Sequence, residues 1–165
     1  MSQVELTPIT EENWREALTL AVGPDRQDFV ASVRPVAAIA LAKAYIKPGG
    51  KTVDPYGIYH QGTMVGFFNL HYTPNSRDDF WLFHFFIDQR FQCRGLGLAA
   101  VGRLIQHLQA SHPTCRRLRL TVHPQNQSAQ RFYQVLGFSD DGVLTFGELT
   151  YSLVIPCSSS VSGRT

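Results

Sequence analysis

The chain of 165 residues has few lysines, few cysteines and no long apolar run. No stretch is apolar for long enough to cross a bilayer, and the polar, acidic segment 1–14 lacks the pattern of a signal peptide. The three cysteines, Cys93, Cys115 and Cys157, are odd in number and widely spaced, so they indicate neither a disulfide framework nor a metal site. We therefore expect a cytoplasmic protein that holds no metal and has no membrane partner.

A large excess of charge of either sign is also missing. The formal net charge of +2 is too small to indicate a nucleic-acid partner. Hydrophobic residues make up 44% of the chain and charged residues 17%, which is typical of an ordinary globular protein. At this length we expect one domain over residues 1–155, followed by a serine-rich tail over residues 156–165.

Hydrophobic patterning predicts an α/β (α+β) fold around a mixed sheet whose first half is antiparallel. Strands are expected at residues 4–8, in a hairpin within residues 56–72 that turns at Gly62, and at residues 80–87, 118–122, 143–146 and 149–155. Helices are expected at residues 14–22 and 36–46, from Leu98 to Leu108, and from Asn126 to a C-cap at Gly137.

The segment Gln92-Cys-Arg-Gly-Leu-Gly97 connects the apolar strand at residues 80–87 to the helix that begins at Leu98. The first N–H groups of a helix have no partner within it, and the helix dipole adds partial positive charge there. Glycines let such a turn approach a pyrophosphate closely, and Arg94 adds a charged donor. The sequence therefore predicts that this turn binds a phosphorylated ligand.

A second motif follows at Asn126-Gln-Ser-Ala-Gln-Arg-Phe-Tyr133-Gln-Val-Leu-Gly-Phe138. Together with the Gly-rich turn it resembles the GNAT superfamily of N-acetyltransferases, closely over residues 80–138 and more loosely elsewhere. The helical segments 13–15 and 27–32 are similar to the spermine/spermidine-acetylating branch of that family.

The resemblance implies a mainly antiparallel sheet flanked by helices, with splayed central strands. The strand at residues 80–87 would carry a bulge and open away from residues 118–122, so that its backbone pairs with the pantetheine arm of acetyl-CoA. The cofactor-binding residues would be Phe86, Ile87, Asp88, Gln92, Cys93, Arg94, Gly95, Leu96, Gly97, Leu98, Asn126 and Tyr133.

The reaction would be direct attack of an amine on the thioester in a ternary complex. Tyr133 would donate a proton to the departing thiolate, because a phenol stays protonated at neutral pH. His84 is the candidate base, since an imidazole is mostly neutral there and residues two apart, such as His84 and Phe86, share a strand face. A backbone N–H near Ile87 would stabilise the oxyanion. A purely structural place in the core is the alternative for both side chains.

Other functions remain open at this point. The chain could be an acyl-CoA sensor without turnover, and Gly95–Ala100 formally fits a dinucleotide-binding motif. The acceptor could be a polyamine or another small-molecule amine such as an amino-group antibiotic or a free amino acid, and protein amines also remain open. A polycation would need carboxylates in its pocket. The late strands are a candidate surface for a homodimer. The candidate carboxylates are Glu12, Asp25, Asp28, Asp54, Asp78 and Asp79.

Overall fold

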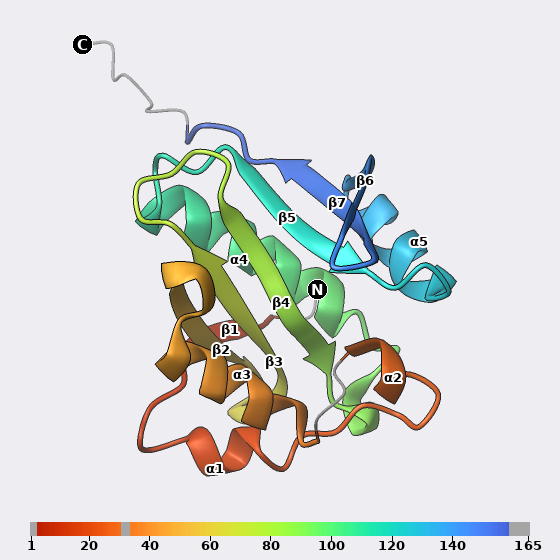
Figure 1. Ribbon diagram of the computed structural model, residues 1–165. Coiled ribbons are helices and arrows are strands. Elements are labelled where there is room, and N and C mark those ends of the chain that lie inside the picture. The colour runs from red at the N-terminus through yellow and green to blue at the C-terminus, as the bar shows by residue number, and fades with distance from the viewer. Residues whose placement is uncertain (1–2, 31–33, 159–165) are drawn as a thin grey trace, which may run out of the picture.

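A computed structural model describes residues 3–30 and 34–158, and these form a seven-stranded sheet flanked by helices (Figure 1). The strands lie in the order β1-β2-β3-β4-β5-β7-β6, and every neighbouring pair is antiparallel except β4 and β5. The expected mixed, mainly antiparallel sheet is therefore confirmed. The strands are β1 (Glu5–Pro8), β2 (Thr52–His60), β3 (Thr63–Tyr72), β4 (Phe80–Ile87), β5 (Arg117–Val122), β6 (Ser139–Thr145) and β7 (Glu148–Val154).

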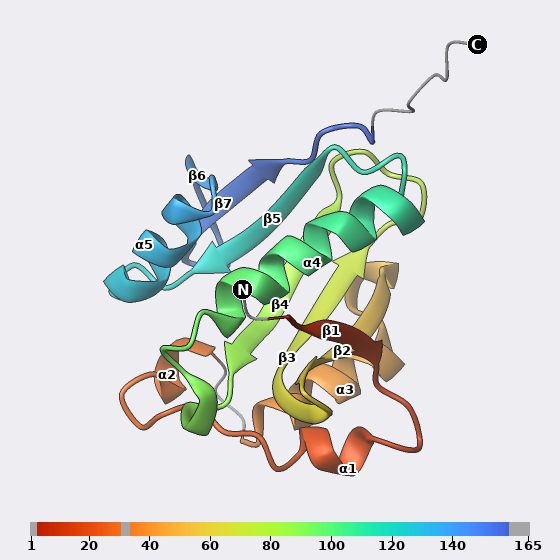
Figure 2. The same ribbon diagram turned by 180° about the vertical axis from the view of Figure 1, so that it is seen from behind.

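Helices cover both faces of this sheet. The long helix α4 and the helix α5 lie on one face, as Figure 2 shows, and α1 and α3 lie on the other. The short helix α2 lies near the end of β4 in both views. The helical elements are α1 (Trp14–Ala17), α2 (Gln27–Val30), α3 (Val36–Ile46), the 3₁₀ turns η1 (Pro48–Gly50) and η2 (Gln89–Phe91), α4 (Leu96–Ser111) and α5 (Gln127–Val135).

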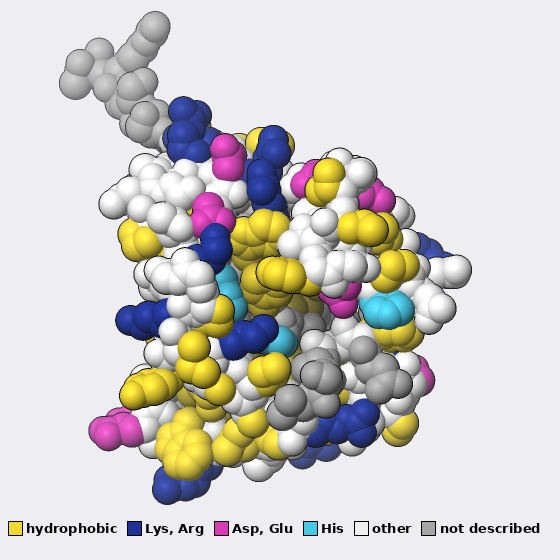
Figure 3. All heavy atoms as spheres, in the orientation of Figure 1, with side chains coloured by type: hydrophobic (Ala, Val, Ile, Leu, Met, Phe, Trp, Pro, Cys, Tyr) yellow, Lys and Arg dark blue, Asp and Glu magenta, His cyan; other side chains and the backbone are white. Residues whose placement is uncertain are grey.

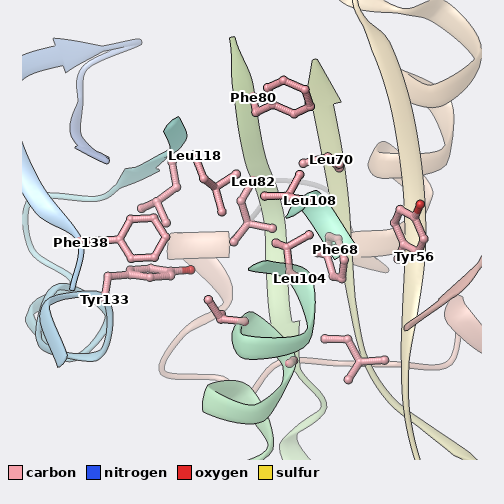
Figure 4. Close-up of a cluster of buried hydrophobic side chains, with 14 of the residues drawn as sticks. Tyr56, Phe68, Leu70, Phe80, Leu82, Leu104, Leu108, Leu118, Tyr133 and Phe138 are labelled. Atoms are coloured by element: carbon pink, nitrogen blue, oxygen red, sulfur yellow. The ribbon is translucent and has the colours of Figure 1, made fainter. Parts of the chain in front are cut away.

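Two hydrophobic clusters hold the helices on the sheet. On the α4 face, Leu104 and Leu108 pack against the strand residue Leu82 (Figure 4). On the opposite face, Phe67 and Phe86 pack against the alanines of α3. Burying a side chain of leucine or phenylalanine size stabilises the fold by about 1.5–3 kcal/mol. The two clusters therefore fix β3 and β4 from both sides, as the continuous apolar pattern of residues 80–87 predicts.

The strands β4 and β5 separate along their length. They pair only from Phe80–Leu82 to Leu118–Leu120, so the second half of β4 has no neighbour on that side. A β-bulge lies within this free half, because the three-residue step from Phe83 to Phe86 faces a two-residue step on β3, and His84 adopts a left-handed φ of 55° there. The expected bulge and splayed strands are confirmed.

The expected helix at residues 14–22 is wrong beyond Ala17. The chain leaves the helix there, and Leu20 and Val22 are buried in the cluster on the α3 face. The backbone of Ala21 is bonded to the end of β4, since its N–H donates to Asp88 over 2.9 Å and its carbonyl accepts from Gln89 over 2.8 Å. These tertiary contacts outweigh the helical periodicity of the segment.

The expected strand at residues 143–146 is also misplaced, because β6 begins at Ser139. Its residues are almost all exposed and it contains an irregularity between Asp140 and Leu144, so no alternating pattern marks it. Most of the expected tail lies outside the described residues. Within the described ranges, no helix has the length and apolar character needed to span a membrane.

Candidate active site

A first cavity of about 330 Å³ lies between the free half of β4, the Gly-rich turn and α5. Ten of the twelve residues expected to bind the cofactor line it, and Asp88 and Arg94 do not. The ten are Phe86, Ile87, Gln92, Cys93, Gly95, Leu96, Gly97, Leu98, Asn126 and Tyr133. Two motifs that are far apart in the sequence therefore meet at one concave surface.

The free edge of β4 presents backbone groups to this cavity. The Asp88 N–H donates to the Val65 carbonyl over 2.8 Å. Because bonding to a neighbouring strand alternates along an antiparallel pair, the N–H and carbonyl of Ile87 point away from β3 toward the gap. The Ile87 carbonyl accepts a hydrogen bond of 3.0 Å from the Gln92 side chain, whereas the Ile87 N–H faces the gap, where a ligand can accept from it.

Asp88 has a structural place instead of a place in the cavity. Its buried carboxylate accepts hydrogen bonds from the backbone N–H groups of Ala21 and Arg90 and from the Arg90 guanidinium. Burial acts to raise the pKa of this carboxyl, but the bonds to Arg90 and Ala21 outweigh it and leave the pKa below its usual value. Asp88 thus anchors the segment between β4 and the turn.

The Gly-rich turn leads directly into α4. Gly95 is the N-cap with a left-handed φ of 74°, and no side chain caps the helix. No acidic residue lies in the first helical turn, so the uncapped N–H groups and the dipole favour an anion. Arg94 is exposed and stacks over the Phe91 ring at 5.7 Å. The surrounding sheet is mainly antiparallel, which excludes the parallel sheet that a dinucleotide-binding motif requires.

Tyr133 and Asn126 lie at the gap between β4 and β5. Figure 4 shows the Tyr133 ring projecting from α5 with its hydroxyl toward β4. Burial raises the pKa of this phenol above its ordinary value, so the hydroxyl remains a proton donor. Asn126 lines the cavity and also caps α5, because its side-chain oxygen accepts from the Ala129 N–H over 3.1 Å.

A second cavity of about 360 Å³ opens on the face that carries α3. Hydrophobic and basic side chains border the hollow on this face in Figure 3. The charged side chains that line it are Lys43 and Glu148, beside His84 and His123. The two cavities share five lining residues, Val30, Phe85, Asn126, Ala129 and Tyr133. The two cavities therefore adjoin at the gap between β4 and β5.

His84 lies in the second cavity in contact with Lys43. The two side-chain nitrogens, Nε2 of His84 and Nζ of Lys43, are 3.1 Å apart. Burial, together with the positive charge of Lys43, lowers the pKa of His84 to about 4. The imidazole is therefore neutral at pH 7, and the ammonium occupies the lone pair that a base would use.

Two charged residues of the second cavity were absent from the sequence-based site. Lys43 belongs to an alanine-rich helix and meets His84 across 41 sequence positions, and Glu148 follows a hairpin turn; neither lies in a recognisable motif. The carboxylates expected to line the acceptor pocket do not do so in the described part of the chain. Glu12, Asp25, Asp54, Asp78 and Asp79 line neither cavity, and the side chain of Asp28 lies outside the described residues.

Comparison with known proteins agrees with this geometry. Residues 26–138 match the model of the Acetyltransferase (GNAT) family. A spermine/spermidine N(1)-acetyltransferase of Bacillus subtilis (strain 168) is 32% identical over 148 residues, which cover 87% of this chain and 92% of that protein. A 5-NmdU N-acetyltransferase of Pseudomonas phage PaMx11 is 34% identical over 89 residues, covering 54% and 59% of the two chains.

Solved structures show the same fold. The spermidine N-acetyltransferase from Vibrio cholerae, in complex with CoA and spermine, superposes with a TM-score of 0.72 at 13% identity, over 93% of this chain and 96% of that one. The RimL acetyltransferase of ribosomal L7/L12 gives a TM-score of 0.73 at 15% identity, over 94% and 92%. With the family match and the splayed strands, these findings show that the chain is an acetyltransferase of the GNAT family.

Proposed function

We propose that this enzyme transfers the acetyl group of acetyl-CoA to a primary amine by direct attack in a ternary complex. One observation carries the proposal: the two cavities adjoin at the gap between β4 and β5 and share lining residues that include Tyr133. A thioester bound in the first cavity can then meet an amine that enters through the second.

The first cavity suits acetyl-CoA. The free edge of β4 offers the Ile87 N–H to an extended pantetheine arm, and the uncapped start of α4 offers N–H groups to the pyrophosphate. Gly97 keeps this surface open, because a Cβ there would lie 3.2 Å from the Phe132 ring. Asn126 contributes through its cap on α5, which fixes the wall opposite β4.

Each bond change has a candidate group. As the amine nitrogen bonds to the acetyl carbon, the carbonyl oxygen gains negative charge, which the Ile87 N–H can stabilise. The C–S bond then breaks, and Tyr133 donates its proton to the thiolate. His84 accepts the proton that the amine loses, directly or through water, once Lys43 no longer occupies its Nε2 atom.

Spermine and spermidine are the first acceptors to test, because the Bacillus relative is named for them. A cytoplasmic location is proposed with the function, and the free thiols of Cys93 and Cys157 on the surface are compatible with a reducing compartment. The exposed side chains of Val143, Leu144 and Phe146 lie on the late strands and their hairpin turn, and a homodimer through them stays a prediction.

The test is a thiol-release assay with acetyl-CoA and a panel of amines that includes polyamines, diamines, amino acids and amino sugars. We expect amine-dependent release of CoA and an acetylated product of equal amount by mass spectrometry. Tight binding of CoA without release by any amine would contradict the proposal and favour an acyl-CoA sensor.

A further inference from the structure

The second cavity carries opposite charges on its two walls. Lys43 reaches it from α3, beside His84 of β4, and Glu148 reaches it from the first residue of β7. Because β5 separates β4 from β7 in the sheet, the ammonium and the carboxylate stand on opposite sides of the opening. Among the described side chains that line the cavity, Glu148 is the only acid and Lys43 the only lysine or arginine.

Neither charge is neutralised by an ion pair within the described part of the chain. The Lys43 ammonium contacts the His84 imidazole and lies 5.7 Å from the centre of the Phe83 ring. Burial lowers the pKa of Lys43, the direction expected for an ammonium without a carboxylate partner. Both groups are thus able to bind an opposite charge on a ligand.

We propose that the acceptor of the acetyl transfer proposed above is an amine that also carries an anionic group, with Lys43 binding the anion and Glu148 attracting the ammonium. Glu148 lies on the same half of the molecule as Tyr133, since α5 is joined to β7 through the Gln134–Tyr151 contact of 3.4 Å. The amine end is thereby directed toward Tyr133, where the C–S bond of the thioester breaks. The volume of about 360 Å³ is that of a small-molecule site.

A diamine or polyamine fits this charge pattern less well. A polycation long enough to span the cavity would place a second ammonium close to Lys43. Two like charges about 4 Å apart near a protein surface repel strongly enough to lower affinity by about tenfold or more. Lys43 thus selects against such acceptors.

The same contact links acceptor choice to the base. While Lys43 donates to Nε2 of His84, the imidazole cannot take a proton from the amine. An anionic group on the acceptor attracts Lys43 and frees Nε2, which then takes one proton of the ammonium through water, so that the neutral amine can attack. As the C–N bond forms and the C–S bond breaks, Tyr133 gives its proton to the thiolate and takes up the second proton that the nitrogen loses. Lys43 is in this sense a positioning residue for His84.

Three acceptors of equal length test the proposal: aminohexanoate, hexylamine and diaminohexane, which differ only in the charge of one end. For each, kcat/KM is measured with acetyl-CoA, and equilibrium binding is measured to the CoA complex. We expect aminohexanoate to exceed hexylamine, and hexylamine to exceed diaminohexane, by about tenfold at each step in both measurements.

Substitution of Lys43 tests whether this residue causes the preference among the three acceptors. In Lys43→Gln, aminohexanoate should lose about tenfold in kcat/KM while diaminohexane is unchanged or improved, so that their ratio collapses. Lys43→Arg keeps the charge and should keep the order. Lys47→Gln is the matched control, because Lys47 caps the same helix, is exposed and lines neither cavity.

The outcomes separate the two proposals. A wild-type preference for diaminohexane or spermidine, or a ratio that Lys43→Gln leaves unchanged, overturns the assignment of an anionic acceptor while acetyl transfer stands. Absence of CoA release with every amine contradicts the transferase proposal, and the binding order to the CoA complex still decides the charge preference of the cavity.

Discussion

The side-chain amide of Gln92 donates a hydrogen bond to the carbonyl oxygen of Ile87 over 3.0 Å. This contact ties the Gly-rich turn to the end of β4, and both residues line the first cavity. Both backbone groups of Ile87 face the gap. Because Gln92 engages the carbonyl, the N–H is the group left for a ligand. The position of the proposed pyrophosphate site relative to the proposed oxyanion donor depends on it.

Replacing Gln92 should therefore weaken CoA binding. A hydrogen bond of this kind contributes about 1 kcal/mol, so Gln92→Ala should raise the Kd for CoA about fivefold in calorimetry. Gln109→Ala is the matched control, because Gln109 donates a similar bond of 3.1 Å to the Pro156 carbonyl and lines neither cavity. Equal CoA affinities for the two variants would show that the turn is positioned without Gln92.

Gly97 gives a steric test of the same cavity. Its missing Cβ would lie 3.2 Å from the Phe132 ring and 3.7 Å from Ile87, so Gly97→Val should fill the space between α4 and α5. We expect the Kd for CoA to rise by about tenfold or more, measured by calorimetry. Gly102→Val in the same helix has open space around it and should leave the Kd unchanged. Unaltered CoA binding in Gly97→Val would place the ligand elsewhere.

The sequence predicts this half of the site well because its signals are local. The aromatic run from Phe80 to Ile87 reproduces the bounds of β4, and this run, the turn and the Asn126 motif together bring ten of twelve expected residues to one cavity. The sequence-based predictions fail where contacts between distant residues determine the local structure. The backbone of Ala21 is held by Asp88 instead of continuing a helix.

The acceptor side was not predictable for the same reason. Lys43 and Glu148 become neighbours of the gap only when α3 and β7 pack against the sheet, and neither has a marker in its local sequence. His84 was a candidate by residue type, but its pKa is lowered by burial and by its contact with Lys43, and that contact depends on a helix residue 41 positions away. Local motifs thus predict the proposed acetyl-CoA site, and only tertiary packing brings together the residues of the proposed acceptor site.

Tyr133→Phe should separate catalysis from binding. It removes the hydroxyl that is proposed to protonate the thiolate and keeps the ring that packs against Phe132 and Phe138. We expect kcat to fall about a hundredfold with little change in the Kd for CoA. Tyr56→Phe is the control, since Tyr56 is equally buried, bonds His107 over 3.1 Å and lines neither cavity. An unchanged kcat in Tyr133→Phe would mean that water, and not Tyr133, protonates the departing thiolate.

The stability of the fold should depend on pH through two buried histidines. Burial lowers the pKa values of His71 and His84 to about 4, and the charge of Lys43 acts in the same direction on both. In the unfolded chain both groups bind protons near pH 6.5. As the pH falls from about 6.5 toward 4, the unfolded state therefore takes up protons that the native state refuses, and the free energy of unfolding decreases.

Urea titrations between pH 8 and 4.5 measure this decrease. One pKa unit corresponds to about 1.4 kcal/mol, so His84 alone destabilises the native state by up to roughly 3 kcal/mol at the acid end. His84→Gln should flatten the dependence by that share, since glutamine does not titrate. His60→Gln is the control, because His60 contacts the backbone of Gln3 near the surface. A pH dependence of equal slope in wild type and His84→Gln would mean that the imidazole is protonated as easily in the folded chain as in the unfolded one.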